Sequence, residues 1–167
     1  MFVRNAWYNA GWDHMFTQGK RSIVARQMAG ERVVLYRKPD GQIAAMEDRC
    51  PHRQAALSLG QKEGDGLRCM YHGMRFGADG KCNEIPGQDT IPERACVRVY
   101  PVVEKDNWVW VWMGDKEKAD PKLIPFAVTR ESTEIPASSL NPSPAKTSGT
   151  SDGLVSTMFK PNCFAIL

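Results

Sequence analysis

The chain has 167 residues, a net charge of +3 and a 42% share of hydrophobic residues, which is enough for the core of one domain but not comfortably of two. So small a charge, without a basic stripe, argues against nucleic acid and membrane surfaces as partners. No window approaches the roughly 18 apolar residues that span a bilayer, and the N-terminus lacks the basic segment and apolar run of a secretory signal. We therefore expect a soluble, cytoplasmic protein.

The first fifty residues indicate short strands joined by tight turns. The aromatic cluster between Trp7 and Phe16 is typical of a packed domain edge rather than of a ligand site. Strands are expected over residues 20–29, 33–36 and 43–46, with turns at 30–31 and 38–41. The last of these strands leads the chain to Cys50.

Two loops then carry residues that can ligate metal. The first has the spacing Cys-x-His, at Cys50 and His52, and the second has Cys-x-x-His, at Cys69 and His72. A zinc finger instead keeps its Cys pair and its His pair each together. One Cys and one His in each loop suit a two-iron cluster in which two thiolates hold one iron and two imidazoles hold the other. A Cys2His2 zinc site is the alternative.

The second half of the domain also indicates strands. Residues 54–68 are rich in Gly, Ser and Lys and predict a connecting loop that lets the second ligand loop face the first. A hairpin turn is expected at 75–81 and a loop over 84–95. Strands are expected at 97–103 and 108–112. In the last strand, tryptophans occupy one face and valines the other, which predicts burial on both faces.

The two loops resemble the Rieske motif of aromatic-ring hydroxylating and O-demethylating oxygenases. The resemblance rests on Cys50, His52, Cys69 and His72 with Pro51, Arg53, Tyr71 and Gly73 around them, and it extends from Phe2 to about Phe126. It is greatest to terminal oxygenase subunits of the vanillate and dicamba O-demethylase type. Met70 and Met74 depart from the family pattern, since Pro and Trp are usual there.

The resemblance implies an all-β Rieske [2Fe-2S] fold over residues 1–126, made of short antiparallel strands with two cluster-binding hairpin loops. Cys50 and Cys69 would hold the iron that stays ferric, and His52 and His72 the iron that takes the electron. Gly73 is expected to let backbone approach the cluster, and Arg53 either steers a redox partner or is merely solvated. The remaining cysteines, Cys82, Cys96 and Cys163, are interpreted as small buried hydrophobes.

The tail differs in character from the rest of the chain. Residues 129–153 are dense in Ser, Thr and Pro and show no strand or helix period, so 127–167 is interpreted as a linker or irregular tail. The resemblance also implies a mononuclear Fe(II), held by two His and a carboxylate in a C-terminal catalytic domain. The chain has three His, of which only His14 is left for such a site. We therefore expect that iron only in a catalytic domain that this chain does not encode.

Two functions follow from these observations. In the first, the chain is the Rieske electron-transfer domain of an oxidoreductase, the oxygenase, and passes electrons from a reductase or ferredoxin to the mononuclear iron of a neighbouring oxygenase subunit; a homotrimer is compatible with this. In the second, it is a stand-alone Rieske ferredoxin. The N-terminal stretch and the path to Phe126 resemble oxygenases and favour the first. Neither function involves nucleic acid or a membrane.

Overall fold

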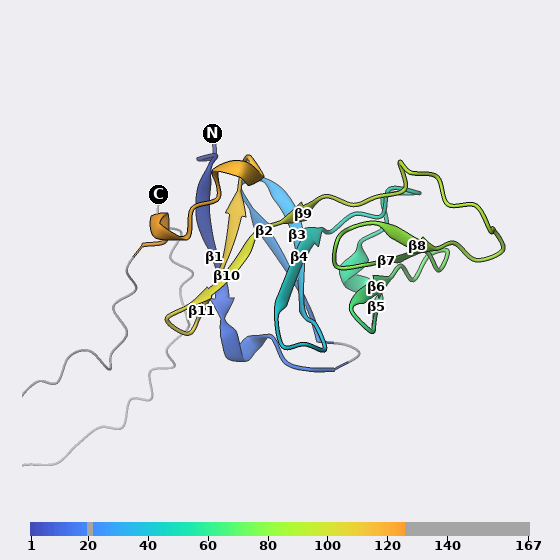
Figure 1. Ribbon diagram of the computed structural model, residues 1–167, viewed down its shortest axis with the longest axis horizontal. Helices are drawn as coiled ribbons and strands as arrows, with labels where there is room; N and C mark the ends of the chain where they lie inside the picture. Colours follow the sequence, from blue (N-terminus) through green and yellow to red (C-terminus); the bar gives the residue numbers. More distant parts are fainter. Residues whose placement is uncertain (20–21, 126–167) are drawn as a thin grey trace, which may run out of the picture. The chain divides into compact units, whose positions relative to one another are not determined.

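The structure is a computed structural model that describes residues 1–19 and 22–125. These residues form an all-β domain with three antiparallel sheets (Figure 1), as predicted. The strands are β1 (Ala6–Trp12), β2 (Ile23–Met28), β3 (Glu31–Arg37), β4 (Ile43–Glu47), β5 (Gln61–Glu63), β6 (Gly66–Arg68), β7 (Arg75–Phe76), β8 (Cys82–Glu84), β9 (Val99–Tyr100), β10 (Val102–Lys105) and β11 (Trp108–Met113). The short 3-10 helices are η1 (Asp13–Met15), η2 (Leu57–Leu59), η3 (Lys116–Lys118) and η4 (Pro121–Leu123). In the described part of the chain, no helix is long and apolar enough to cross a membrane.

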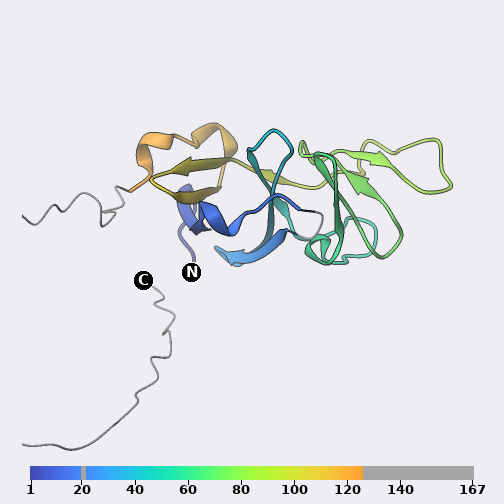
Figure 2. The same ribbon diagram turned by 90° about the horizontal axis from the view of Figure 1, so that it is seen from below.

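The central sheet separates two hydrophobic cores. Its strand order is β2-β3-β4-β9, and both ribbon views place it between the β1-β11-β10 sheet and the β5-β6-β7-β8 sheet (Figures 1 and 2). Along β3, Val33 and Leu35 enter the core shared with β11, whereas Val34 and Tyr36 enter the core shared with β6, β7 and β8. Alternate residues of one strand therefore join the two halves of the domain.

The tryptophan strand has the two buried faces that its sequence predicts. Val109 and Val111 of β11 lie in the first core, and Trp110 and Trp112 pack on the opposite face with Trp7. The expected strand at 97–103 is divided at Pro101, since β9 pairs with β4 and β10 pairs with β11. Proline cannot donate to a sheet ladder, so the chain changes sheets at this residue.

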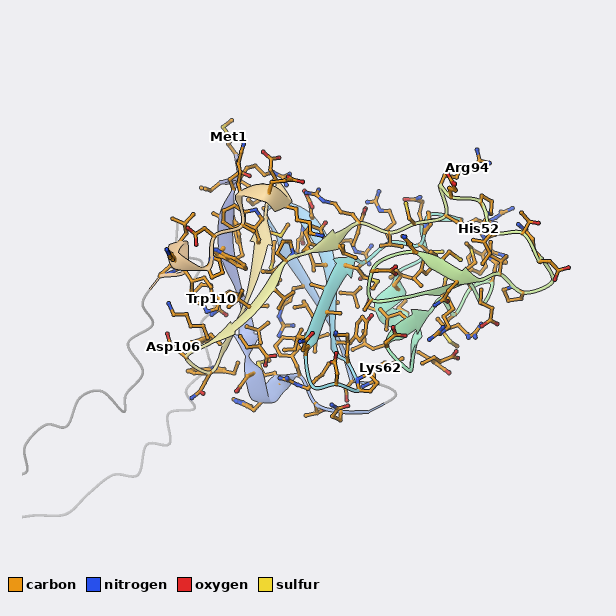
Figure 3. All side chains as sticks on the ribbon, in the orientation of Figure 1. Met1, His52, Lys62, Arg94, Asp106 and Trp110 are labelled. Atoms are coloured by element: carbon orange, nitrogen blue, oxygen red, sulfur yellow. The ribbon has the colours of Figure 1, made fainter. Side chains whose placement is uncertain are left out.

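The prediction of a loop over residues 54–68 is wrong. This segment contains η2 and the hairpin β5-β6, in which Gln61 to Glu63 pair with Gly66 to Arg68. Leu57 and Leu67 are fully buried, and the ammonium group of Lys62, labelled in Figure 3, donates to the carbonyl oxygen of Arg37 at 2.9 Å. Three-residue strands are too short to show the alternation that identifies a strand.

The expected tail, 127–167, lies outside the described residues, and so does its boundary at Phe126. Residues 20–21, at the start of the predicted strand 20–29, also lie outside the described residues. The described part of that strand is β2, and it begins at Ile23.

Candidate metal centre

The two predicted ligand loops have the same backbone geometry. In the first, the N–H of Cys50 donates to the carbonyl of Ala55 at 2.8 Å, and the carbonyl of Cys50 accepts from Gln54 at 2.9 Å. In the second, Cys69 makes the corresponding bonds with Met74, at 2.8 Å, and with Gly73, at 3.0 Å. The fourth residue after each cysteine has a positive φ, 61° at Gln54 and 77° at Gly73. Each loop thus turns back on its cysteine in the same way.

Each loop is tied to its neighbours by a charged side chain that the sequence analysis missed. Beside the first loop, the buried carboxylate of Asp48 accepts from both the backbone N–H and the hydroxyl of Ser58, each at 2.7 Å. At the second, a guanidinium N–H of Arg68 donates to the carbonyl of Gly73 at 2.7 Å. The only sequence signal is position, since Asp48 and Arg68 lie within two residues of Cys50 and Cys69.

The two cysteines lie together in the core. Both are only 2% exposed, and they belong to the same hydrophobic core cluster. Burial, together with the adjacent Cys69 thiol, raises the pKa of Cys50 to about 11, although the backbone N–H groups of His52 and Arg53 act in the opposite direction. At neutral pH, Cys50 therefore becomes a thiolate only when a cation binds it.

The two histidines lie together at the surface. The ring centroids of His52 and His72 are 4.5 Å apart with an interplanar angle of 66°. The ring centroid of Tyr71, the residue before His72, lies 3.9 Å from the ring centroid of His72. Burial lowers the pKa of His72, and so do the charges of His52 and Arg53. A low pKa favours the neutral imidazole, which is the form that binds metal.

The structure thus shows the predicted ligands as two pairs, a buried cysteine pair and an exposed imidazole pair. Two separate pairs suit a cluster of two irons with unlike ends. Among residues 1–19 and 22–125, no group of three or more His, Cys, Asp and Glu side chains is placed to hold a single metal ion. The third histidine, His14, is in η1, directly after β1, and stacks on Trp12.

A groove of about 660 Å³ adjoins the imidazole pair. His52 and His72 form one side of it, and Ile85, Pro86 and Arg94 line it from the loop that follows β8. Figure 3 shows His52 and Arg94 at the same end of the domain. Apolar walls with two imidazoles and a guanidinium are the features of a surface that receives another molecule.

The remaining cysteine predictions have mixed outcomes. Cys82 is buried, as expected, but Cys96 is exposed, and Cys163 lies outside the described residues. Gly73 makes a close approach, but the contact that the structure shows is with Pro86, whose Cγ would be 2.8 Å from an added Cβ.

Comparison with known families decides between an iron-sulfur cluster and zinc. The family model of the Rieske [2Fe-2S] domain matches residues 6–101. This chain belongs to that family. The cofactor of the Rieske domain is the [2Fe-2S] cluster, as predicted, and its donor set fits the thiol and imidazole pairs described above.

Curated relatives of this Rieske domain are oxygenase subunits, as the sequence resemblance indicates. The chain is 47% identical over 124 residues to the iron-sulfur subunit of the toluene-4-sulfonate monooxygenase system of Comamonas testosteroni, covering 74% of this chain and 35% of the relative. It is 44% identical to the vanillate O-demethylase oxygenase subunit of a Pseudomonas strain, covering 74% and 34% of the two chains.

Solved structures agree with this family. The crystal structure of apo dicamba monooxygenase superposes with a TM-score of 0.70 at 41% identity, over 75% of this chain and 38% of that one. A further crystal structure of dicamba monooxygenase contains a non-heme iron. The chain therefore spans about a third of the length of the relatives that it matches.

Proposed function

We propose that this Rieske domain is the electron-transfer part of an oxygenase subunit. Cys50 and Cys69 would ligate one iron of the cluster, and His52 and His72 the other. The observation that carries the proposal is the separation of the donors, with the thiols in the core and the imidazoles exposed beside the groove. When bound, the cluster supplies a site that takes up and releases one electron.

The side chains of this domain define where an electron enters and leaves. A histidine that binds iron through one ring nitrogen keeps the other for hydrogen bonding. Because His52 and His72 are exposed, that nitrogen is accessible to a partner protein or to a proton. The buried cysteines, by contrast, are shielded from water and from competing metals and thiols.

The relatives support the choice of partners, because they include the iron-sulfur subunit of a monooxygenase system and the oxygenase component of dicamba O-demethylase. We infer that a reductase or ferredoxin delivers the electron. The acceptor would be a mononuclear iron in the catalytic domain of a neighbouring subunit, within an assembly such as a homotrimer. The Rieske domain itself would occupy residues 1–126. A stand-alone ferredoxin is less well supported, since the relatives named above are oxygenase subunits.

The ligand assignment is tested by metal analysis of anaerobically purified protein. The unmodified chain is expected to contain about two irons and two acid-labile sulfides. Cys69→Ser and His52→Ala should each abolish the cluster, measured as iron, sulfide and visible absorbance. Cys82→Ala is the matched control, because Cys82 is also buried but lies in β8, outside both loops. Equal loss in all three variants would show that the ligand set is wrong.

Whether the chain only transfers electrons is tested with reductase, NADH and an aromatic substrate. The chain alone is expected to accept electrons, seen as bleaching of the cluster absorbance, without forming hydroxylated or demethylated product. Product formation by this polypeptide alone would contradict the proposal that a separate catalytic domain performs the oxygen chemistry.

A further inference from the structure

Arg68 hydrogen-bonds to the second ligand loop and to the strands around it, and no sequence motif indicates these contacts. It is the last residue of β6 and directly precedes Cys69. Its Nε donates to Glu63 at 2.7 Å, and its Nη1 and Nη2 donate to the two carboxylate oxygens of Glu84 at 3.0 and 2.7 Å. Nη1 also donates to the carbonyl of Gly73 at 2.7 Å. The guanidinium therefore joins three strands and the loop.

The Gly73 carbonyl lies in the peptide unit that directly follows His72 and Gly73, so its position affects the backbone of the second ligand loop. Gly73 follows His72, and its own N–H already closes the loop on the carbonyl of Cys69. Its Cα faces Pro86, which lines the groove. With the carbonyl held by Arg68, the backbone on the C-terminal side of His72 is fixed from both sides.

Arg75 provides a natural comparison within the same sheet. It is directly paired with Arg68 across β6 and β7, and its side chain is about as exposed, 23% against 24%. The hydrogen bonds of Arg75, however, go to the carbonyl of Glu63 and the carboxylate of Asp65, at 3.0 and 3.2 Å. Two neighbouring cations in one sheet thus differ in whether they contact the ligand loop.

We propose that Arg68 is a positioning residue that holds the Gly73 carbonyl, and thereby fixes the orientation of His72 toward the cluster. The inference rests on the proposed function for its link to the cluster. A planar guanidinium suits the task because its fixed fork of donors can bind a carboxylate and a carbonyl together, whereas a lysine ammonium offers only a flexible point charge. Glu63 and Glu84 hold the fork in place.

The test compares Arg68→Gln, Arg68→Lys and the control Arg75→Gln in the full chain with its cluster. The readouts are the electron paramagnetic resonance spectrum of the reduced cluster, its reduction potential and the hydrogen exchange rate of the Gly73 amide. Both Arg68 variants are expected to change the spectrum and to speed exchange at Gly73 about tenfold, the effect of one lost charged hydrogen bond. Arg68→Gln should also lower the potential, because a positive charge favours the reduced cluster.

Two outcomes would overturn the proposal. If Arg68→Lys matches the unmodified chain in spectrum and exchange, only the charge matters and positioning is excluded. If Arg75→Gln changes all readouts as Arg68→Gln does, the effect is one of general charge or sheet stability. Should the unmodified chain bind no cluster, the proposed function fails, but the Gly73 exchange rate in the cluster-free variants still decides whether Arg68 holds the loop.

Discussion

At the scale of single residues, the two ligand loops have the same backbone conformation at equivalent positions but carry different residues there, Gln54 and Gly73. Both need a positive φ four residues after the cysteine, and Gly73 meets this need without steric cost, whereas Gln54 does not. Gly73 has a second constraint, since an added Cβ would lie 2.8 Å from the Cγ of Pro86. The requirement for glycine is therefore strict in the second loop and relaxed in the first.

This difference predicts that two substitutions differ in how much they destabilise the domain. Gly73→Ala is expected to destabilise the domain by about 1–3 kcal/mol and to weaken cluster retention, because it adds strain at φ 77° and a clash with Pro86. Gln54→Gly should stay within about 1 kcal/mol of the unmodified chain, since relief of strain opposes the entropy of an added glycine. Urea unfolding and the rate of cluster loss under air measure both. Comparable destabilisation in the two variants would contradict the different constraints.

At the scale of the elements, a charged cluster around Glu31 joins β3 to β9 and to the N-terminal segment. Tyr100 donates to the Glu31 carboxylate at 2.6 Å, Arg98 pairs with it at 3.3 Å, and Arg4 also contacts it. Burial alone would raise the pKa of Glu31, but the hydrogen bonds from Tyr100 and Arg4 and the charges of Arg98 and Arg4 outweigh it, so this pKa is lowered.

The lowered pKa predicts how stability depends on pH. A carboxyl group whose pKa is lower in the folded state stabilises the fold above its unfolded pKa, and this stability is lost as the pH falls through the folded pKa. Tyr100→Phe is therefore expected to cost about 1–2 kcal/mol above about pH 5, and less below about pH 4. Urea titrations across this range measure it. Tyr8→Phe is the control, because the Tyr8 hydroxyl donates to the neutral carbonyl of Val3; a pH-independent difference for Tyr100→Phe would contradict the role of Glu31.

At the scale of the whole molecule, the residues after β11 complete a third, smaller hydrophobic cluster on the tryptophan face of β11. Ile124 is only 4% exposed and packs with Trp7, Trp110 and Trp112. The indole N–H of Trp7 donates to the carbonyl of Asp120 at 2.7 Å. The segment that leaves the last strand therefore belongs to the domain, and the proposed boundary at Phe126 lies just beyond it.

This boundary predicts the outcome of truncation. A chain that ends after Phe126 should keep the cluster and the unfolding midpoint of the full chain. A chain that ends after Asp115 should lose at least about 2 kcal/mol, because the Trp7 hydrogen bond and the burial of Ile124 are removed. Thermal unfolding of both chains, with iron content, is the measurement. Loss of the cluster in the chain that ends after Phe126 would move the domain boundary into 127–167.

The candidate site could be predicted from the sequence because its signal is local. Four candidate ligands of two types, Cys and His, stand at fixed spacing in two loops, Cys50 to His52 and Cys69 to His72, and restrict the chemistry before any fold is known. The strands β3 and β11 could also be predicted from local sequence, since both are long enough to show their pattern. The hairpin β5-β6 is too short to show one.

The sequence by itself thus determined the four candidate ligands, the all-β fold and the strands that are long enough to show alternation. Only the tertiary structure decided which side chains support the ligand loops, that the chain changes sheets at Pro101, and that the thiols are buried while the imidazoles are exposed. The contacts of Asp48 and Arg68 join residues 5 to 16 positions apart. The physical reason is that hydrogen bonds and burial depend on which segments are in contact in the folded chain, and a local sequence pattern does not specify those contacts.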